Sequence, residues 1–110
     1  MEYFPDQWQI VEVAGTDPHL RIFGSWSGGY LDSDHWRINS GVEAIEDEKE
    51  YWKMIGFSGS VYYCHKKRYG IRSPHNAAVL YRIGQDNNTN VLEEEPEDVY
   101  KFVDNFVNKV

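Results

Sequence analysis

Cysteine is almost absent from this chain, which has Cys64 alone among its 110 residues. A single cysteine excludes an intrachain disulfide, and small secreted domains usually depend on several. No apolar run approaches the roughly 20 residues that span a bilayer, and residues 1–6 lack the basic start and apolar stretch typical of a signal peptide. These absences predict a soluble cytoplasmic protein with no membrane segment.

Acidic residues are missing from positions 51–82, which carry six Lys or Arg residues. The flanks are acidic: residues 1–50 hold eleven Asp or Glu against three basic residues, and residues 83–110 hold seven against two. The net charge of −7 argues against nonspecific nucleic-acid binding by the whole surface. Two interpretations of this segregation stay open. The basic segment either faces a ligand or pairs with the acidic flanks of the same chain.

The first two-thirds of the chain has the pattern of β-strands. Hydrophobic residues make up 41% of the chain and aromatic residues 15%, which is enough for one core in a single domain, 1–110. The segments rich in β-branched and aromatic residues, separated by turn signals, are 7–13, 20–23, 35–39, 42–46, 51–57 and 60–66. Short strands with short connections favour an antiparallel meander. We expect one sheet of five to six strands within residues 1–67.

Two helices are predicted after the sheet. Ser73 and Pro74 are typical of a helix start and Gly84 of a helix end, so residues 73–84 form a short helix. Residues 85–90 are polar and predict a loop. The last segment, 96–109, is predicted as an amphipathic helix packed on the sheet. Its apolar stripe is Val99, Phe102, Val103, Phe106, Val107 and Val110. The predicted fold class is α+β.

The basic segment interleaves its cations with aromatic residues, and Trp26 lies between serines in a glycine-rich stretch. Cations beside aromatic rings suit a single-stranded nucleic acid or another phosphate-bearing ligand. The candidate binding residues are therefore Lys53, Lys66, Lys67, Arg68, Tyr69, Arg72 and Trp26.

Catalytic and metal-binding patterns are weak. Cys64 and His65 suggest a nucleophile and its base, but adjacent residues of a strand point to opposite faces. Asp32, Asp34 and His35 form a loose acidic cluster, whereas zinc sites have defined ligand spacings and usually further cysteines. The glycine-rich stretches 24–29 and 56–60 lack the remaining residues of a phosphate-binding loop. We predict no metal, no cofactor and no catalytic residue.

A resemblance adds to this picture. The strings GSWSGGY at 24–30, WRINSGV at 36–42 and GFSGSVYYCHK at 56–66, followed by Tyr69 and Gly70, stand in a distinctive order. In this order they resemble small proteins of tailed bacteriophages, of the T4-like type that infects marine cyanobacteria, over roughly residues 20–85. The resemblance implies a protein made inside an infected bacterium. It carries over no catalytic or binding residue.

The leading prediction is a non-enzymatic phage accessory protein that binds a host or phage macromolecule. An acidic, aromatic-rich domain suits specific contacts with a protein, so another protein is the first-ranked partner. The protein itself is expected to be a monomer or a homodimer. Binding of a nucleic acid or nucleotide through 53–82 is the alternative. The acidic runs 43–50 and 93–98 also suggest a nucleic-acid mimic, and a small enzyme using Cys64 or His65 ranks last.

Overall fold

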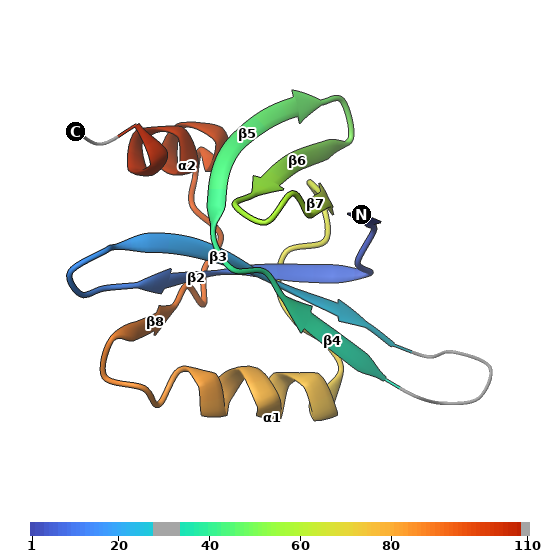
Figure 1. Cartoon of the computed structure of the whole chain (residues 1–110). Helices are drawn as coiled ribbons and strands as arrows, with labels where there is room; N and C mark the ends of the chain where they lie inside the picture. Colours follow the sequence, from blue (N-terminus) through green and yellow to red (C-terminus); the bar gives the residue numbers. More distant parts are fainter. Residues whose placement is uncertain (28–33, 109–110) are drawn as a thin grey trace.

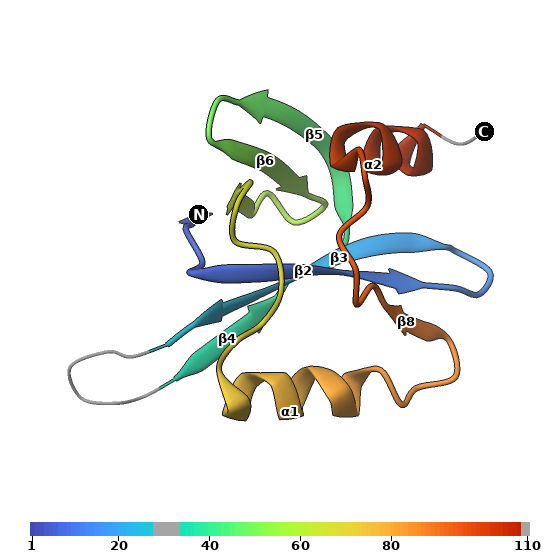
Figure 2. The same ribbon diagram turned by 180° about the vertical axis from the view of Figure 1, so that it is seen from behind.

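The computed structural model describes residues 1–27 and 34–108, and it is α+β. The chain order of the elements is seen in Figure 1, and the same ribbon is seen from behind in Figure 2. The strands are β1 Glu2–Tyr3, β2 Gln7–Val13, β3 His19–Trp26, β4 His35–Ile38, β5 Val42–Glu48, β6 Tyr51–Gly56, β7 Val61–His65 and β8 Thr89–Val91. The helices are α1 Pro74–Ile83 and α2 Val99–Val107.

The strands form two sheets, so the predicted single meander is wrong. Sheet A has the order β1-β7-β6-β5, and sheet B has the order β4-β3-β2-β8. Two meanders are present, β2-β3-β4 and β5-β6-β7, and all their pairings are antiparallel. The chain changes sheets between β4 and β5.

The change of sheet occurs at Asn39–Ser40–Gly41. The Asn39 side-chain oxygen accepts a hydrogen bond from the Ile22 backbone N–H at 2.9 Å, which ends the β3–β4 ladder with a side chain. Gly41 has φ 151° and contacts Phe57 so closely that a Cβ atom there would lie 2.5 Å from the ring. Glycine adopts this backbone conformation readily, whereas other residues are strained in it. The chain therefore turns out of sheet B at this point.

Two edge strands were not predicted. β1 pairs in parallel with β7, through Glu2↔Val61 and Tyr3↔Tyr62. β8 lies within a segment predicted as loop up to Asn90, and it pairs antiparallel with β2. Both strands are two or three residues long, so neither has enough alternation to be recognised from its own sequence.

Sheet B is the middle layer of the molecule and is covered on both faces (Figure 1). On one face, Trp8, Ile10, Leu20 and Ile22 pack against sheet A and α2 in the main core. On the other face, Val11 and Phe23 pack with Val79 and Leu80 of α1. Consecutive apolar residues in β2 and β3 reflect this two-sided burial.

Both helices are present, with capped starts. The Ser73 hydroxyl accepts from the Asn76 backbone N–H at 3.1 Å, and Pro74 opens α1 as predicted. The C-terminal helix starts at Val99 and not at Pro96, because the Asp98 carboxylate caps it by accepting from Lys101 N–H at 3.0 Å. Val99 and Val103 of α2 are buried in the main core, which agrees with a helix packed on a sheet. Val110 of the predicted stripe and residue 109 lie outside the described residues.

Two buried tyrosines predict sensitivity to alkali. Burial raises the pKa of Tyr62 and of Tyr69 well above the ordinary value of 10.0. In the unfolded chain both ionise at their ordinary pKa, so their contribution to stability is complete below about pH 10 and is lost as the pH rises further. We expect the free energy of unfolding, measured with urea, to fall steadily between about pH 10 and 11.5. A flat profile over this range would contradict the burial of both phenols.

Candidate functional site

The outer face of sheet A carries the side chains that point away from the core. Strand pairing aligns them in three rungs across β5, β6 and β7. The rungs are Glu48–Tyr51–His65, Glu46–Lys53–Tyr63 and Ala44–Ile55–Val61. Residues between them, such as Met54 and Cys64, point inward and are buried. Both helices pack elsewhere, α2 against the core and α1 against sheet B, so this face remains half-exposed.

Aromatic rings occupy the centre of this face. Phe4, which follows β1, stacks on Tyr63 with ring centroids 4.6 Å apart and an interplanar angle of 5°. Tyr51 stands edge-on to both rings, at 6.0 and 6.2 Å, and His65 stands edge-on to Tyr51 at 5.3 Å. Phe4 is 54% exposed. We call Phe4, Tyr51, Tyr63 and His65 the aromatic face.

Carboxylates dominate the charge around the aromatic face. The Tyr63 hydroxyl donates to Glu2 at 3.3 Å, and Lys53 lies 6.0 Å above the Tyr63 ring and 3.6 Å from Glu46. The pKa of Lys53 is raised by Tyr63 first and then by Glu46 and Glu48. The pKa of Tyr63 is raised by its partial burial and then by Glu2, with Lys53 acting in the opposite direction. The contributions of the carboxylates to these shifts, from Glu46 and Glu48 on Lys53 and from Glu2 on Tyr63, indicate a local field that favours positive charge.

A hollow of about 220 Å³ opens at the lower end of the aromatic face. It is lined by Phe4, Tyr51 and His65 together with Asp6 and Arg68, and Pro5 completes it. Asp6 and Arg68 give this hollow one acidic and one basic side chain beside the aromatic residues, which suit polar groups of a bound chain. The hollow therefore extends the aromatic face toward the turn after β7.

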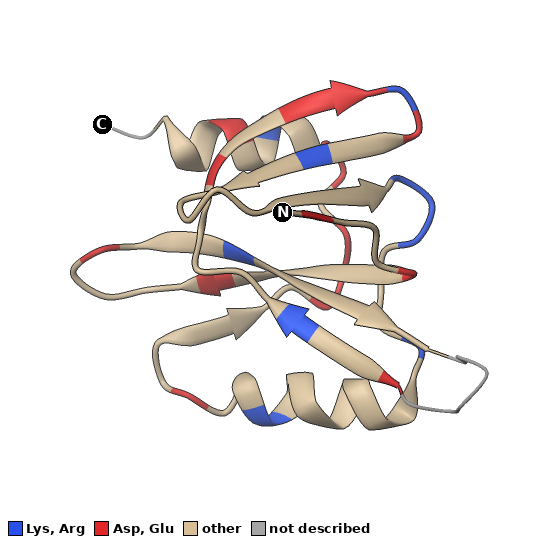
Figure 3. Ribbon diagram, turned by 45° about the vertical axis from the view of Figure 1, so that its right-hand side comes forward, with Lys and Arg blue, Asp and Glu red and all other residues tan. Residues whose placement is uncertain are grey.

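The predicted binding residues are only partly brought together. Lys53 and Arg68 adjoin the aromatic face. Lys66 lies elsewhere: its ammonium pairs with Asp47 at 2.6 Å and sits 4.1 Å from the Trp52 ring centroid. Figure 3 shows the acidic β5 beside the basic positions of β6 and of the turn after β7. The ion pairs of Lys53 and Lys66 agree with the interpretation that the basic segment pairs with an acidic flank.

The remaining predicted residues have separate places. Lys67 and Arg72 are exposed, in the turn after β7 and before α1. Tyr69 is a structural residue, because its hydroxyl donates to the Leu92 carbonyl at 2.8 Å and accepts from Ile10 N–H at 3.1 Å. Trp26 lies at the end of β3, where its ring stacks on His35 at 4.9 Å and its Nε1–H donates to the Phe4 carbonyl at 3.0 Å.

Cys64 and His65 do not form a dyad. Cys64 is fully buried between the sheets, while His65 lies on the aromatic face with its Nδ1 accepting from the Lys67 backbone N–H at 3.1 Å. Burial raises the pKa of the Cys64 thiol well above its usual value. A thiol in this state is a poor nucleophile.

The folded protein is therefore expected to resist thiol reagents. An aromatic disulfide reagent should label Cys64 within minutes in guanidinium chloride and not over hours in buffer, because access requires the core to open. Rapid labelling of the folded protein would contradict the burial of Cys64 and reopen the enzyme hypothesis.

The described residues contain no group of three or more His, Cys, Asp or Glu side chains arranged to hold a metal. Asp32, from the loose cluster suggested by the sequence, lies outside the described residues, and Asp34 accepts from the Ser73 hydroxyl at 2.5 Å. Within the same part of the chain, neither helix is long and apolar enough to cross a membrane.

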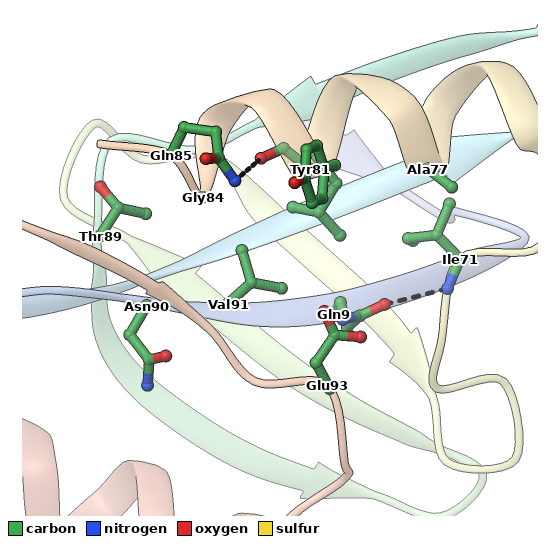
Figure 4. A pocket seen from close by; sticks show the side chains of 11 residues that line it. Gln9, Ile71, Ala77, Tyr81, Gly84, Gln85, Thr89, Asn90, Val91 and Glu93 are labelled. Carbon is green, nitrogen blue, oxygen red and sulfur yellow. Dashed lines mark hydrogen bonds between the residues drawn. The ribbon is translucent and has the colours of Figure 1, made fainter. Parts of the chain in front are cut away.

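A second cleft, of about 450 Å³, lies between α1 and the strands β2 and β8 (Figure 4). Its amides are largely engaged within the protein: Gln9 accepts from Ile71 N–H at 3.1 Å and donates to the Leu92 carbonyl at 3.1 Å, and Gln85 donates to the Tyr81 carbonyl at 3.4 Å. Tyr81 and Glu93 are the titratable side chains among those that line it. Its floor is already paired, so it carries less binding potential than the aromatic face.

The aromatic face was missed as a unit, although its signal was present. Tyr51 and Lys53 alternate in one predicted strand, and Tyr63 and His65 alternate in the next, so period-two reading places them on one face. Phe4 joins them through the parallel pairing of β1 with β7, which no local pattern indicates. Comparison with protein-family models, curated proteins and solved structures finds no match to this chain.

Proposed function

We propose that this protein is a non-enzymatic accessory protein that binds another protein through the aromatic face, and that the bound segment is rich in arginine or lysine. The observation that carries the proposal is the combination of Phe4, Tyr51 and Tyr63 with the carboxylates of Glu2, Glu46 and Glu48 on one uncovered sheet face. Aromatic rings at the centre of a polar rim are typical of energetically important interface residues. The phage origin implied by the sequence resemblance is part of the same proposal.

Charge selects the partner. Lys53, the cation within the rungs of this face, already has Glu46 and Tyr63 as neighbours. An arriving guanidinium gains from ring faces and from the acidic field together, because cation–π attraction and Coulomb attraction act in the same direction. A phosphate backbone would meet the same carboxylates with the opposite sign. A basic protein segment therefore fits better than a nucleic-acid strand on this face.

A peptide titration tests the selectivity. We expect a nonapeptide of alternating arginine and glycine to bind more tightly than its lysine counterpart, because the planar guanidinium stacks on rings. A glutamate–glycine peptide should not bind. Glu48→Gln should weaken binding of the arginine peptide about threefold, as for the loss of an exposed charge pair. The matched change Glu94→Gln, in the loop before α2, should leave binding unchanged. Equal binding of basic and acidic peptides would overturn the proposal.

A further inference from the structure

A cleft of about 520 Å³ lies between the edge strands of the two sheets. β1 is the outer strand of sheet A and β4 is the outer strand of sheet B. Tyr3 of β1 and the following Phe4 line it, together with Trp26 of β3 and His35 and Arg37 of β4. The volume falls within the roughly 300–1,000 Å³ of small-molecule sites. This cleft borders the aromatic face: Phe4 belongs to both, and Glu2, one of the carboxylates around that face, also lines the cleft.

The aromatic walls of the cleft are fixed by contacts within the protein. Trp26 and His35 lie parallel, 4.9 Å apart at 3°, and Trp26 stands edge-on to Tyr3 at 6.3 Å. The Trp26 indole N–H is anchored on the Phe4 carbonyl, so the ring is held between the two sheets before any guest arrives. Rings fixed in this way stack a planar guest with little loss of conformational freedom.

Arg37 supplies the positive charge of the cleft. Its guanidinium lies 4.6 Å from the centroid of the Tyr3 ring. Across the described residues the ion pairs are Lys53–Glu46 and Lys66–Asp47, and Arg37 takes part in neither. An exposed guanidinium held on a ring face presents paired N–H donors, which match a phosphate group. Glu2, which also lines the cleft, offers an acceptor for hydroxyl or amino groups.

We infer that this cleft binds a nucleotide, with its base stacked on the rings around Trp26 and its phosphate on Arg37. A planar ring with an attached anion matches the aromatic walls and the guanidinium together. A neutral sugar leaves the charge of Arg37 unused, and a basic side chain is repelled by it. The inference does not rest on the proposed function: Glu2 and Phe4 adjoin both sites, but Trp26 and Arg37, which carry the inference, lie outside the aromatic face. The nucleotide is either free or part of a single strand.

Titrations followed by amide and indole N–H signals in two-dimensional NMR test the cleft. The probes are adenosine 5′-monophosphate, uridine 5′-monophosphate, adenosine without phosphate, and a five-nucleotide single strand of DNA. We expect saturable shifts at Trp26 and Arg37 with both monophosphates, and about tenfold weaker binding of adenosine, because the phosphate contact is missing. A strand that binds more than about tenfold tighter than the monophosphates identifies a nucleic acid, and equal affinities identify a free nucleotide.

Two charge-neutralising variants separate the cleft from general electrostatics. Arg37→Gln should weaken binding of the monophosphates about tenfold. Arg82→Gln, at an exposed position in the last turn of α1, should leave their binding unchanged. Shifts at the cleft with none of the probes, or equal losses in both variants, would overturn the inference. The comparison of adenosine with its monophosphate uses the unaltered protein, so it decides the matter even if Arg37→Gln fails to fold.

Discussion

Trp8→Ala is expected to lower the free energy of unfolding by about 3–5 kcal/mol, the cost of truncating a large buried aromatic residue. Trp8 has no exposed surface and lies where β2 passes beneath sheet A. Its Nε1–H donates to the His65 carbonyl at 2.7 Å, and its ring meets Tyr69 edge-on at 4.8 Å. One side chain thus joins β2 of sheet B to the end of β7 in sheet A. Its loss leaves a cavity between the sheets and removes one of the two hydrogen bonds that the His65 carbonyl accepts, the other coming from the Arg68 N–H at 3.0 Å.

The matched control is Trp36→Ala. Trp36 is 40% exposed on the edge strand β4 and stacks on Phe23, so its truncation should cost less than about 1 kcal/mol. Urea unfolding followed by circular dichroism measures both variants. A similar, small loss in both would show that Trp8 does not hold the two sheets together.

Tyr69→Phe is expected to cost about 1–3 kcal/mol through the loss of one hydroxyl group. That hydroxyl donates to the Leu92 carbonyl and accepts from the Ile10 N–H. It therefore connects the segment after β7 both with β2 and with Leu92, the residue that follows β8. The Ile10 carbonyl accepts from Leu92 N–H on the same side of β2, which leaves Tyr69 as the partner of the Ile10 N–H. Removal of the hydroxyl therefore leaves the buried Ile10 N–H without a hydrogen-bond acceptor.

Tyr81→Phe is the control, because it removes a phenol hydroxyl from a residue of α1 that is 70% exposed. It should change the free energy of unfolding by less than about 0.5 kcal/mol. Tyr69→Phe should also make the fall in stability above about pH 10 shallower, since one raised phenol pKa is gone. If the two substitutions have the same effect at pH 7, Tyr69 is a surface residue as the sequence suggested, and its structural assignment is wrong.

Local patterns predicted most strands, both helices and the α+β class, because each depends on neighbouring residues. The number of sheets was not predictable in this way. Whether β4 continues to β5 in one sheet depends on the turn at Gly41 and its contact with Phe57, which lies sixteen positions further along the chain. The partners of β1 and β8 depend on contacts between residues that are still further apart in the sequence, such as Glu2 with Val61 and Val11 with Val91.

The charge segregation was visible in the sequence, but its two interpretations could not be separated there. Lys53 pairs across the β5–β6 hairpin with Glu46, while Lys66 reaches Asp47 from beyond β7. These pairs depend on strand register, which fixes the face on which each side chain lies. The sequence suggested that Tyr69 is an exposed stacking residue. In the structure its ring packs against Trp8, next to a turn at Gly70, whose φ is 103°. Composition predicted the residue types of a binding surface and not their positions.

We propose that the aromatic face of sheet A binds a basic protein segment. The most direct measurement maps the arginine–glycine nonapeptide onto the isotopically labelled protein by NMR. Shifts should concentrate on Phe4, Tyr51 and Tyr63, and both Tyr63→Ala and Phe4→Ala should weaken binding about tenfold. Tyr81 is an exposed tyrosine on α1, and the control variant Tyr81→Ala should bind the peptide as tightly as the unaltered protein does. Shifts elsewhere on the molecule, or equal binding by Tyr63→Ala, Phe4→Ala and Tyr81→Ala, would contradict the claim.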